Sequence, residues 1–179
     1  MRFLPCLLLL CACSAPAPQD TVDGAALLEA WRSEIIALPP QFAPSLPAGE
    51  EELRFAPGMY DAQAEDYWSY AYVLRLAEPV AHSRDLLFLL EAYYDGLITA
   101  VASGKDMDVG SDPATVQLQE EGEGRYWAQV DLIDAFVTGE PLRVHMQIDT
   151  STSTLRAAAS PQPRDHPLWR ELLAVRDLL

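Results

Sequence analysis

The side chains that could transfer protons or bind a metal are three histidines and many carboxylates. His82, His145 and His166 lack the His-Glu-x-x-His spacing of a zinc site, so no metal centre is predicted. Asp85, Asp95 and His145 could in principle assemble a triad, but no Gly-x-Ser-x-Gly motif marks a nucleophilic serine. Almost any chain of this length offers such a set. Neither catalytic residues nor a cofactor is therefore predicted.

Acidic residues outnumber basic ones, with 27 Asp and Glu against 12 Lys and Arg, for a net charge of −15. Phosphate contacts dominate nucleic-acid affinity and require clustered cations, so nucleic acid is excluded as a partner. Asp106, Asp108 and Asp112 alternate around Gly110, but Gln117 stands where a calcium loop needs a bidentate glutamate. Weak calcium binding is therefore an alternative to the default interpretation, which is a solvated acidic loop.

Aromatic side chains are better candidates for binding, because tyrosine and tryptophan are favoured where an apolar surface meets a partner. They concentrate between residues 60 and 72, and one more lies on a later predicted strand. The candidates are Tyr60, Trp68, Tyr70, Tyr72 and Trp127. The alternative interpretation is a tyrosine-rich strand that is buried beneath a helix.

A second group of binding candidates shares the polar face of two predicted strands. Arg143 and His145 alternate with apolar residues in segment 142–149, and Arg156 alternates with apolar residues in segment 154–160. An uncovered polar sheet face is a place where a ligand or a protein partner can lie. The alternative is an ordinary solvated face.

The three cysteines all stand near the N-terminus, at positions 6, 11 and 13. The positive charge of Arg2 precedes an apolar run from Phe3 to about Ala12. This run is too short to span a bilayer as a helix, but its length is typical of an export signal. An ordinary secretory signal cut after Ala15 is one interpretation.

The segment Leu10-Cys11-Ala12-Cys13 resembles the lipobox of bacterial lipoproteins. The resemblance implies cleavage before Cys13, lipid on the sulfur of Cys13, and anchoring to a membrane of the cell envelope. Ser14 follows, where an aspartate commonly retains lipoproteins in the inner membrane, so the outer membrane is favoured. Residues 1–12 are therefore expected to form a signal peptide, 13–20 a Pro/Ala tether, and 21–179 a single domain.

Periodicity predicts three helices, at 23–38, at 83–103 and from about Asp165. In the first, Leu28, Trp31, Ile35 and Leu38 recur at helical spacing. The second is expected to end at a left-handed Gly104. Strands are predicted at 53–56, 67–76, 115–120, 126–137, 142–149 and 154–160. Ile148 is expected to face Leu155. The register between 126–137 and 142–149 is not set by the pattern. The order α-ββ-α-ββββ-α predicts an α+β domain with one antiparallel sheet of about six strands and helices packed on it.

Two short segments, Phe55–Tyr60 (Phe-Ala-Pro-Gly-Met-Tyr) and His166–Trp169 (His-Pro-Leu-Trp), resemble features of small envelope lipoproteins that have no assigned activity. This resemblance supports the fold and implies no mechanism. The predicted function is a non-enzymatic, membrane-anchored envelope domain that binds an envelope protein or a small ligand. The alternatives are an envelope hydrolase with a closed polar pocket, and a lipid or lipoprotein carrier with an apolar cavity beneath the sheet.

Overall fold

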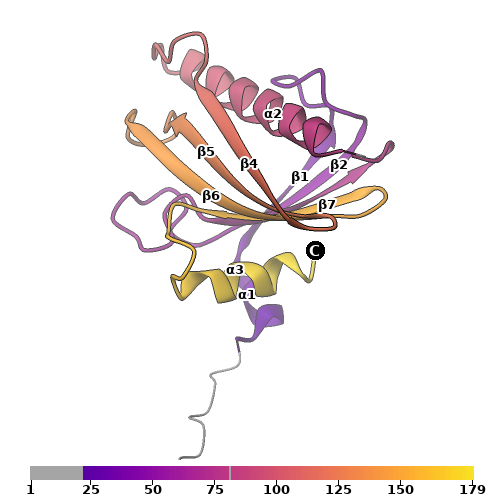
Figure 1. Cartoon of the computed structure of the whole chain (residues 1–179). Coiled ribbons are helices and arrows are strands. Elements are labelled where there is room, and N and C mark those ends of the chain that lie inside the picture. The colour runs from indigo at the N-terminus through magenta and orange to yellow at the C-terminus, as the bar shows by residue number, and fades with distance from the viewer. Residues whose placement is uncertain (1–21, 81) are drawn as a thin grey trace, which may run out of the picture.

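The computed structural model describes residues 22–80 and 82–179, so the predicted signal peptide, the tether and Cys13 lie outside the described residues. The described residues form three helices and seven strands. Figure 1 shows how these elements are arranged. In chain order they are α1 (Gly24–Ala30), β1 (Arg32–Leu38), β2 (Gly49–Phe55), β3 (Tyr70–Leu76), α2 (Ser83–Ser103), β4 (Ala114–Gly122), β5 (Arg125–Ile133), β6 (Pro141–Thr150), β7 (Thr154–Ser160) and α3 (Leu168–Arg176).

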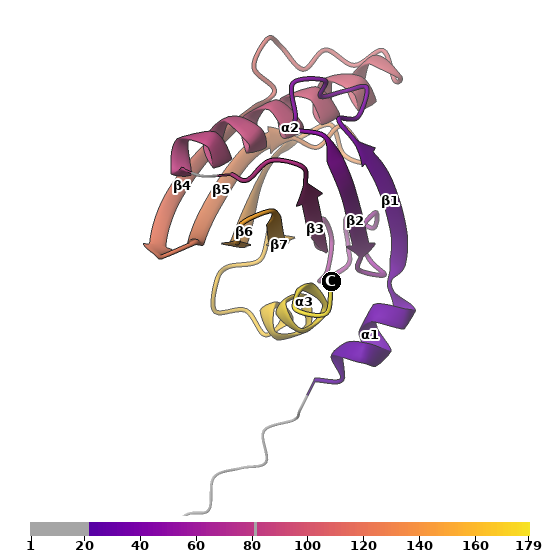
Figure 2. The same ribbon diagram turned by 90° about the vertical axis from the view of Figure 1, so that its right-hand side faces the viewer.

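The seven strands form one antiparallel sheet in the order β1-β2-β3-β7-β6-β5-β4, with β1 and β4 at its edges. The predicted α+β class and single antiparallel sheet are confirmed, although the sheet has seven strands instead of six. Helix α2 lies across one face of the sheet, and α3, with α1 beside it, lies against the other face (Figures 1 and 2).

The additional strand comes from the segment that was expected to be the C-terminal half of a helix over 23–38. Helix α1 ends at Ala30, and β1 pairs with β2 from Arg32↔Phe55 to Leu38↔Gly49. Ile35 is 66% exposed, so its helical spacing from Trp31 does not reflect a shared buried face. Two consecutive β-branched isoleucines fit a strand better than a helix, which explains the error.

Strand β3 is buried on both faces, as its apolar pattern predicts. Tyr70, Tyr72, Leu74 and Leu76 belong to the large core beneath α2, which also contains Trp68. Ala71 and Val73 belong to a smaller core beneath α3, with Trp31, Trp127 and Trp169. The sheet therefore separates two apolar cores, and β3 contributes to both of them.

Helix α2 has the predicted bounds, Ser83–Ser103. Among the described helices, it alone is long and apolar enough to cross a membrane, judged by length and composition only. Its buried side chains pack against the sheet: Leu86, Leu89, Leu90, Tyr93, Tyr94, Ile98 and Ala102. The expected left-handed stop at Gly104 is wrong, because Gly104 has φ −69°. The last turn continues through Gly104, and Asp106, with φ 53°, is the residue that leaves the helical path.

Strand register differs from expectation at one place. Ile148 pairs with Ala157, and Leu155 pairs with Thr150, so the expected pairing of Ile148 with Leu155 is shifted by two residues. A two-residue shift keeps every side chain on its predicted face, because the strand period is two. The register that the sequence leaves open, between β5 and β6, runs without interruption from Arg125↔Asp149 to Ile133↔Pro141.

Candidate functional site

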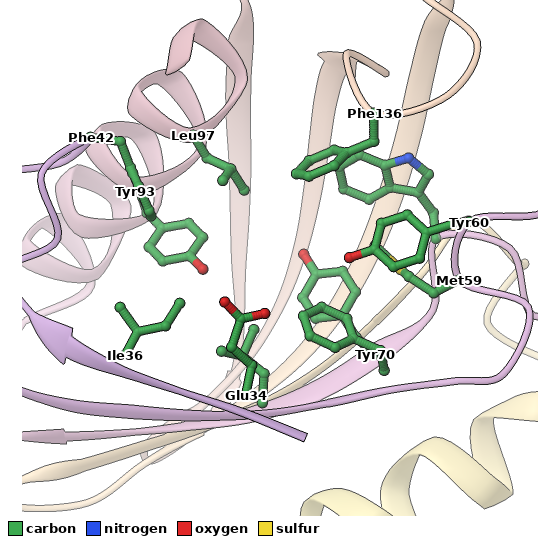
Figure 3. A pocket seen from close by; sticks show the side chains of 12 residues that line it. Glu34, Ile36, Phe42, Met59, Tyr60, Tyr70, Tyr93, Leu97 and Phe136 are labelled. Atoms are coloured by element: carbon green, nitrogen blue, oxygen red, sulfur yellow. The ribbon is translucent and has the colours of Figure 1, made fainter. Parts of the chain in front are cut away.

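An aromatic cavity of about 150 Å³ lies between edge strand β1, helix α2 and the loop that connects β5 to β6 (Figure 3). Seven of its twelve lining residues are aromatic. Apolar cavities of about this volume accommodate a benzene molecule. The lining residues are Glu34, Ile36, Phe42, Leu53, Phe55, Met59, Tyr60, Trp68, Tyr70, Tyr93, Leu97 and Phe136.

Asp134 positions two of the aromatic walls of this cavity. The Trp68 indole N–H donates to its Oδ1 at 2.8 Å, and the backbone N–H of Phe136 donates to the same oxygen at 3.1 Å. The Tyr67 hydroxyl and both the N–H and hydroxyl of Thr138 donate to its Oδ2. These bonds end β5 at Ile133, so the strand that was expected to reach Val137 instead gives way to a loop that carries Phe136 into the cavity.

The charge of Asp134 is stabilised where the side chain is fully buried. Burial raises the pKa of its carboxyl, but the hydrogen bonds from Tyr67, Thr138 and Trp68 outweigh burial and lower the pKa to about 2. Asp134 is therefore an anion whose acceptor capacity is filled by the groups that it holds in place.

Trp68 adopts a backbone conformation that is unusual for a bulky residue, with φ 51°. It is buried, and its ring makes an edge contact with Phe136 at a centroid distance of 5.5 Å. The Asp134 bond to its indole supports this conformation from the side-chain end. Strained residues of this kind concentrate at binding sites, where surrounding contacts over-determine the geometry.

The turn after β2 supplies Met59 and Tyr60. The Gly58 N–H donates to Asp66 Oδ2 at 2.9 Å, and a Cβ on Gly58 would meet Asp66 Oδ1 at 2.0 Å. Only glycine allows this close approach, which explains the glycine in the Phe55–Tyr60 segment. The turn places Tyr60 at the opening of the cavity, where its side chain is 43% exposed.

The opening also carries opposite charges from β1. Glu34 points toward the cavity (Figure 3), and its side chain is 50% exposed. Arg32 lies on the outer side, with its guanidinium carbon 4.7 Å from the ring centre of Phe55 and 5.1 Å from that of Tyr60. Arg32 Nη2 is 4.0 Å from Glu34 Oε2, which makes a long and solvated ion pair of little strength.

A second carboxylate, Glu51, is fully buried on β2 behind the cavity wall. The Tyr93 hydroxyl donates to its two oxygens at 3.0 and 3.2 Å. Burial raises the pKa of Glu51 to about 7, the Tyr93 bond opposes that shift, and the charge of Glu34 adds to it. The two glutamates therefore influence each other electrostatically.

The sheet divides the sequence-predicted binding residues into two groups. Tyr60, Trp68 and Tyr70 line the cavity beneath α2. Tyr72 lies beside them but is buried in the core and stacked on Tyr93, with ring centres 6.5 Å apart, which agrees with the alternative interpretation of a buried tyrosine strand. The remaining four, Trp127, Arg143, His145 and Arg156, belong to the opposite face of the sheet.

The residues on this opposite face contact one another and not a shared cavity. His145 stacks on Trp127 at 5.7 Å, and Trp127 contacts Trp169 of the α3 layer at 5.2 Å. Arg143 pairs with Asp131 through two hydrogen bonds of 2.6 and 2.9 Å. Burial, followed by the charge of Arg143, lowers the pKa of His145. This face is thus partly covered by α3. Arg143 is paired within it, whereas His145 Nδ1 and Arg156 Nε are buried without a hydrogen-bond partner.

The structure does not bring the conceivable triad together. Asp85 and Asp95 are on α2, whereas His145 is on the other side of the sheet. Within residues 22–80 and 82–179, no group of three or more His, Cys, Asp or Glu could hold a metal ion. Asp108 accepts a hydrogen bond from the Gly110 N–H inside its own loop. Asp108 therefore serves its own local turn.

Sequence reasoning missed most of the cavity wall. Phe42, Met59 and Phe136 lie in loops, where no periodic pattern reveals the direction of a side chain. Glu34 was hidden by the helix that was predicted for its segment. Glu51, behind the wall, belongs to a glutamate series at 50–52, and alternation along a strand would place at least one member of that series on the core side.

The chain matches no family model, and comparisons with curated proteins and with solved structures find no match. The functional conclusion therefore depends on the geometry and chemistry of the cavity.

Proposed function

We propose that this chain is a non-enzymatic ligand-binding protein of the bacterial cell envelope that holds a small apolar group in the aromatic cavity. The observation that carries the proposal is the cavity itself, with about 150 Å³ of space and seven aromatic walls. Ligand sites are concave, mostly apolar, and equipped with few polar groups. The cavity meets this description, with Glu34 as the charged group at its opening.

The proposed location follows from the leader. Cys13 carries the lipid, the membrane is the partner of that lipid, and Ser14 favours the outer membrane. Two or more acyl chains give stable attachment, whereas one chain binds only reversibly. The domain would then work close to a membrane, facing the envelope space.

Two alternatives have less support. A lipid or lipoprotein carrier needs room for long chains, and a cavity of about 150 Å³ suits one ring-sized group. A hydrolase needs a nucleophile beside a base, and Asp95 and His145 are on opposite sides of the sheet. A protein partner remains compatible with the proposal, because a partner's aromatic side chain is itself a ring-sized apolar group.

The proposal is tested by titrating the purified protein with toluene and recording the methyl resonances by NMR. Binding in the cavity should shift the methyl signals of Met59 and Leu97 more than those of the α3 face. Leu97→Trp places a large ring in the cavity and should abolish the shift of the Met59 methyl signal, which is the readout compared between variants. Leu87→Trp is the matched control, because Leu87 is a partly buried leucine of the same helix that does not line the cavity.

The variants separate a binding effect from a folding effect. If Leu97→Trp and Leu87→Trp melt at similar temperatures and only Leu97→Trp loses the shifts, the cavity is the binding site. If toluene causes no shift in the wild-type protein, or if both variants retain the shifts, the proposed site is wrong.

A further inference from the structure

We propose that the aromatic cavity selects an organic cation, of the size and chemistry of a quaternary ammonium group. This inference rests on the proposed function, since it names the class of ligand that the same cavity takes. It follows from three observations: the hydrogen-bonding state of the cavity walls, the placement of one carboxylate, and a cation that already lies at the opening.

The polar atoms of the aromatic walls are already used in hydrogen bonds within the protein. The Tyr93 hydroxyl donates to Glu51, the Tyr70 hydroxyl bonds the Tyr94 hydroxyl, and the Trp68 indole donates to Asp134. Tyr93, Tyr70 and Trp68 therefore present ring surfaces to a ligand instead of free donors. A quaternary ammonium group has no N–H to satisfy, and it binds to aromatic faces through their negative quadrupoles.

One carboxylate gives the lining of the cavity a negative charge. Among the described residues that line the cavity, Glu34 alone is charged, and its carboxylate points toward the space between the rings (Figure 3). Its neighbour Arg32 is 4.0 Å away and more than half exposed, so it neutralises Glu34 only weakly. Behind the wall, the buried Glu51 adds to the negative potential when it is ionised. An anionic ligand would be repelled, and a cation would be attracted.

The opening already contains an example of the proposed interaction. The Arg32 guanidinium lies over Phe55 at 4.7 Å and over Tyr60 at 5.1 Å, and its Nη2 donates to the Tyr60 hydroxyl at 2.8 Å. Arg32 does not line the cavity, whose volume is therefore present with this arginine in place. The rings of Phe55 and Tyr60 thus contact a cation, Arg32, outside the cavity. Inside the cavity, the Glu34 carboxylate would attract a second cation.

The experiment compares two probes of the same shape. Choline carries a quaternary nitrogen, and 3,3-dimethyl-1-butanol carries a neutral carbon in the same place. Both are titrated into the purified protein by calorimetry, with the Met59 and Leu97 methyl signals as a second readout. We expect choline to bind at least about tenfold more tightly than the neutral alcohol, because a desolvated cation on aromatic faces is strongly favoured.

Glu34→Gln removes the charge while keeping the shape of the side chain. It should weaken choline binding about tenfold and leave the affinity for the alcohol within about twofold. Glu50→Gln is the control for net charge, because Glu50 is an exposed glutamate that faces away from the cavity on β2. It should leave both affinities nearly unchanged.

The outcomes distinguish the inference from the proposed function. Equal binding of the two probes at the cavity, or an unchanged preference in Glu34→Gln, overturns the selection of cations while leaving a cavity for apolar groups. Failure of both probes to bind overturns the inference, and the proposed function falls with it only if toluene also fails to bind. A preference for choline that disappears in Glu34→Gln and persists in Glu50→Gln supports the inference.

Discussion

Tyr93 and Glu51 face each other across the interface between α2 and the sheet, and the tyrosine hydroxyl donates to both carboxylate oxygens at 3.0 and 3.2 Å. The Tyr93 ring also lines the aromatic cavity, so one residue joins the ligand site to a buried acid. A single tyrosine cannot replace the hydration that a carboxylate loses on burial. The ionisation of Glu51 is therefore linked to the stability of the fold.

Glu51→Gln should stabilise the protein at neutral and alkaline pH. Burial raises the pKa of Glu51 from 4.5 to about 7, so ionisation costs the folded state stability as the pH rises across that interval. Glutamine cannot ionise. Relative to wild type, the variant should gain about 3 kcal/mol of unfolding free energy between pH 4.5 and 7, measured by denaturant titration. A stability difference that does not vary with pH, or the same variation in Glu50→Gln, would contradict this expectation.

Asp134→Asn should destabilise the protein by about 2 to 4 kcal/mol, because an amide NH₂ would then face N–H groups that now find an acceptor. Its pKa of about 2 lies below the ordinary 3.8, so the stabilisation is present above pH 3.8 and is lost as the pH falls toward 2. Acid unfolding of wild type should therefore steepen in that interval. Asp131→Asn is the control and should cost less than about 1 kcal/mol of unfolding free energy, because Asp131 forms an exposed pair with Arg143. Equal losses of stability in both variants would refute the stabilising role of Asp134.

Gly96→Ala should destabilise the protein although alanine favours helices. A Cβ at Gly96 would lie 2.0 Å from the carbonyl oxygen of Phe42, so α2 and the loop that carries Phe42 would have to separate. We expect a loss of about 1 to 3 kcal/mol and weaker binding of toluene. Gly104→Ala is the matched control, since its Cβ would make only ordinary contacts and should be neutral or stabilising. If Gly96→Ala unfolds at a higher temperature than Gly104→Ala, the close approach of Gly96 to the Phe42 carbonyl oxygen is disproved.

Cys13→Ala should release the protein from membranes. The Leu10–Cys13 segment resembles a lipobox, and alanine offers no sulfur for lipid attachment. Cell fractionation should find the wild type with membranes and the variant in the soluble fraction, and a palmitate analogue should label the wild type alone. Cys11→Ala is the control and should remain membrane-bound. If Cys13→Ala stays with the membrane, the anchor is not at this residue.

The fold could be predicted where one periodicity dominated a segment. Alternation from Tyr70 to Leu76 gives a strand that is buried on both faces, and the apolar spacing from Leu86 to Val101 gives the long helix. The segment around Ile35 satisfied two periods at once, because Trp31, Ile35 and Leu38 fit a helix while Ile36 and Leu38 fit a strand. Pairing with β2, which no local pattern reveals, decided the outcome.

The cavity could be predicted only where its aromatic residues cluster in the sequence. Tyr60, Trp68 and Tyr70 were recognised from their clustering, but Phe42 and Phe136 reach the same space from loops at distant positions in the chain. The loop that carries Phe136 is held by hydrogen bonds that Asp134 accepts, and no sequence repeat indicates its direction. The carboxylates were likewise hidden, since a strand that was expected to begin at Leu53 leaves Glu51 in a loop.

The four tryptophans of the chain are divided by the sheet: Trp68 is in the core beneath α2, and Trp31, Trp127 and Trp169 are in the core beneath α3. The molecule therefore contains two optical reporters that are separated by its own β-sheet. The fluorescence of Trp68 is placed to respond to whatever enters the cavity. The other three provide an internal reference that senses the opposite face, so ligand entry and unfolding can be followed separately in one unlabelled molecule.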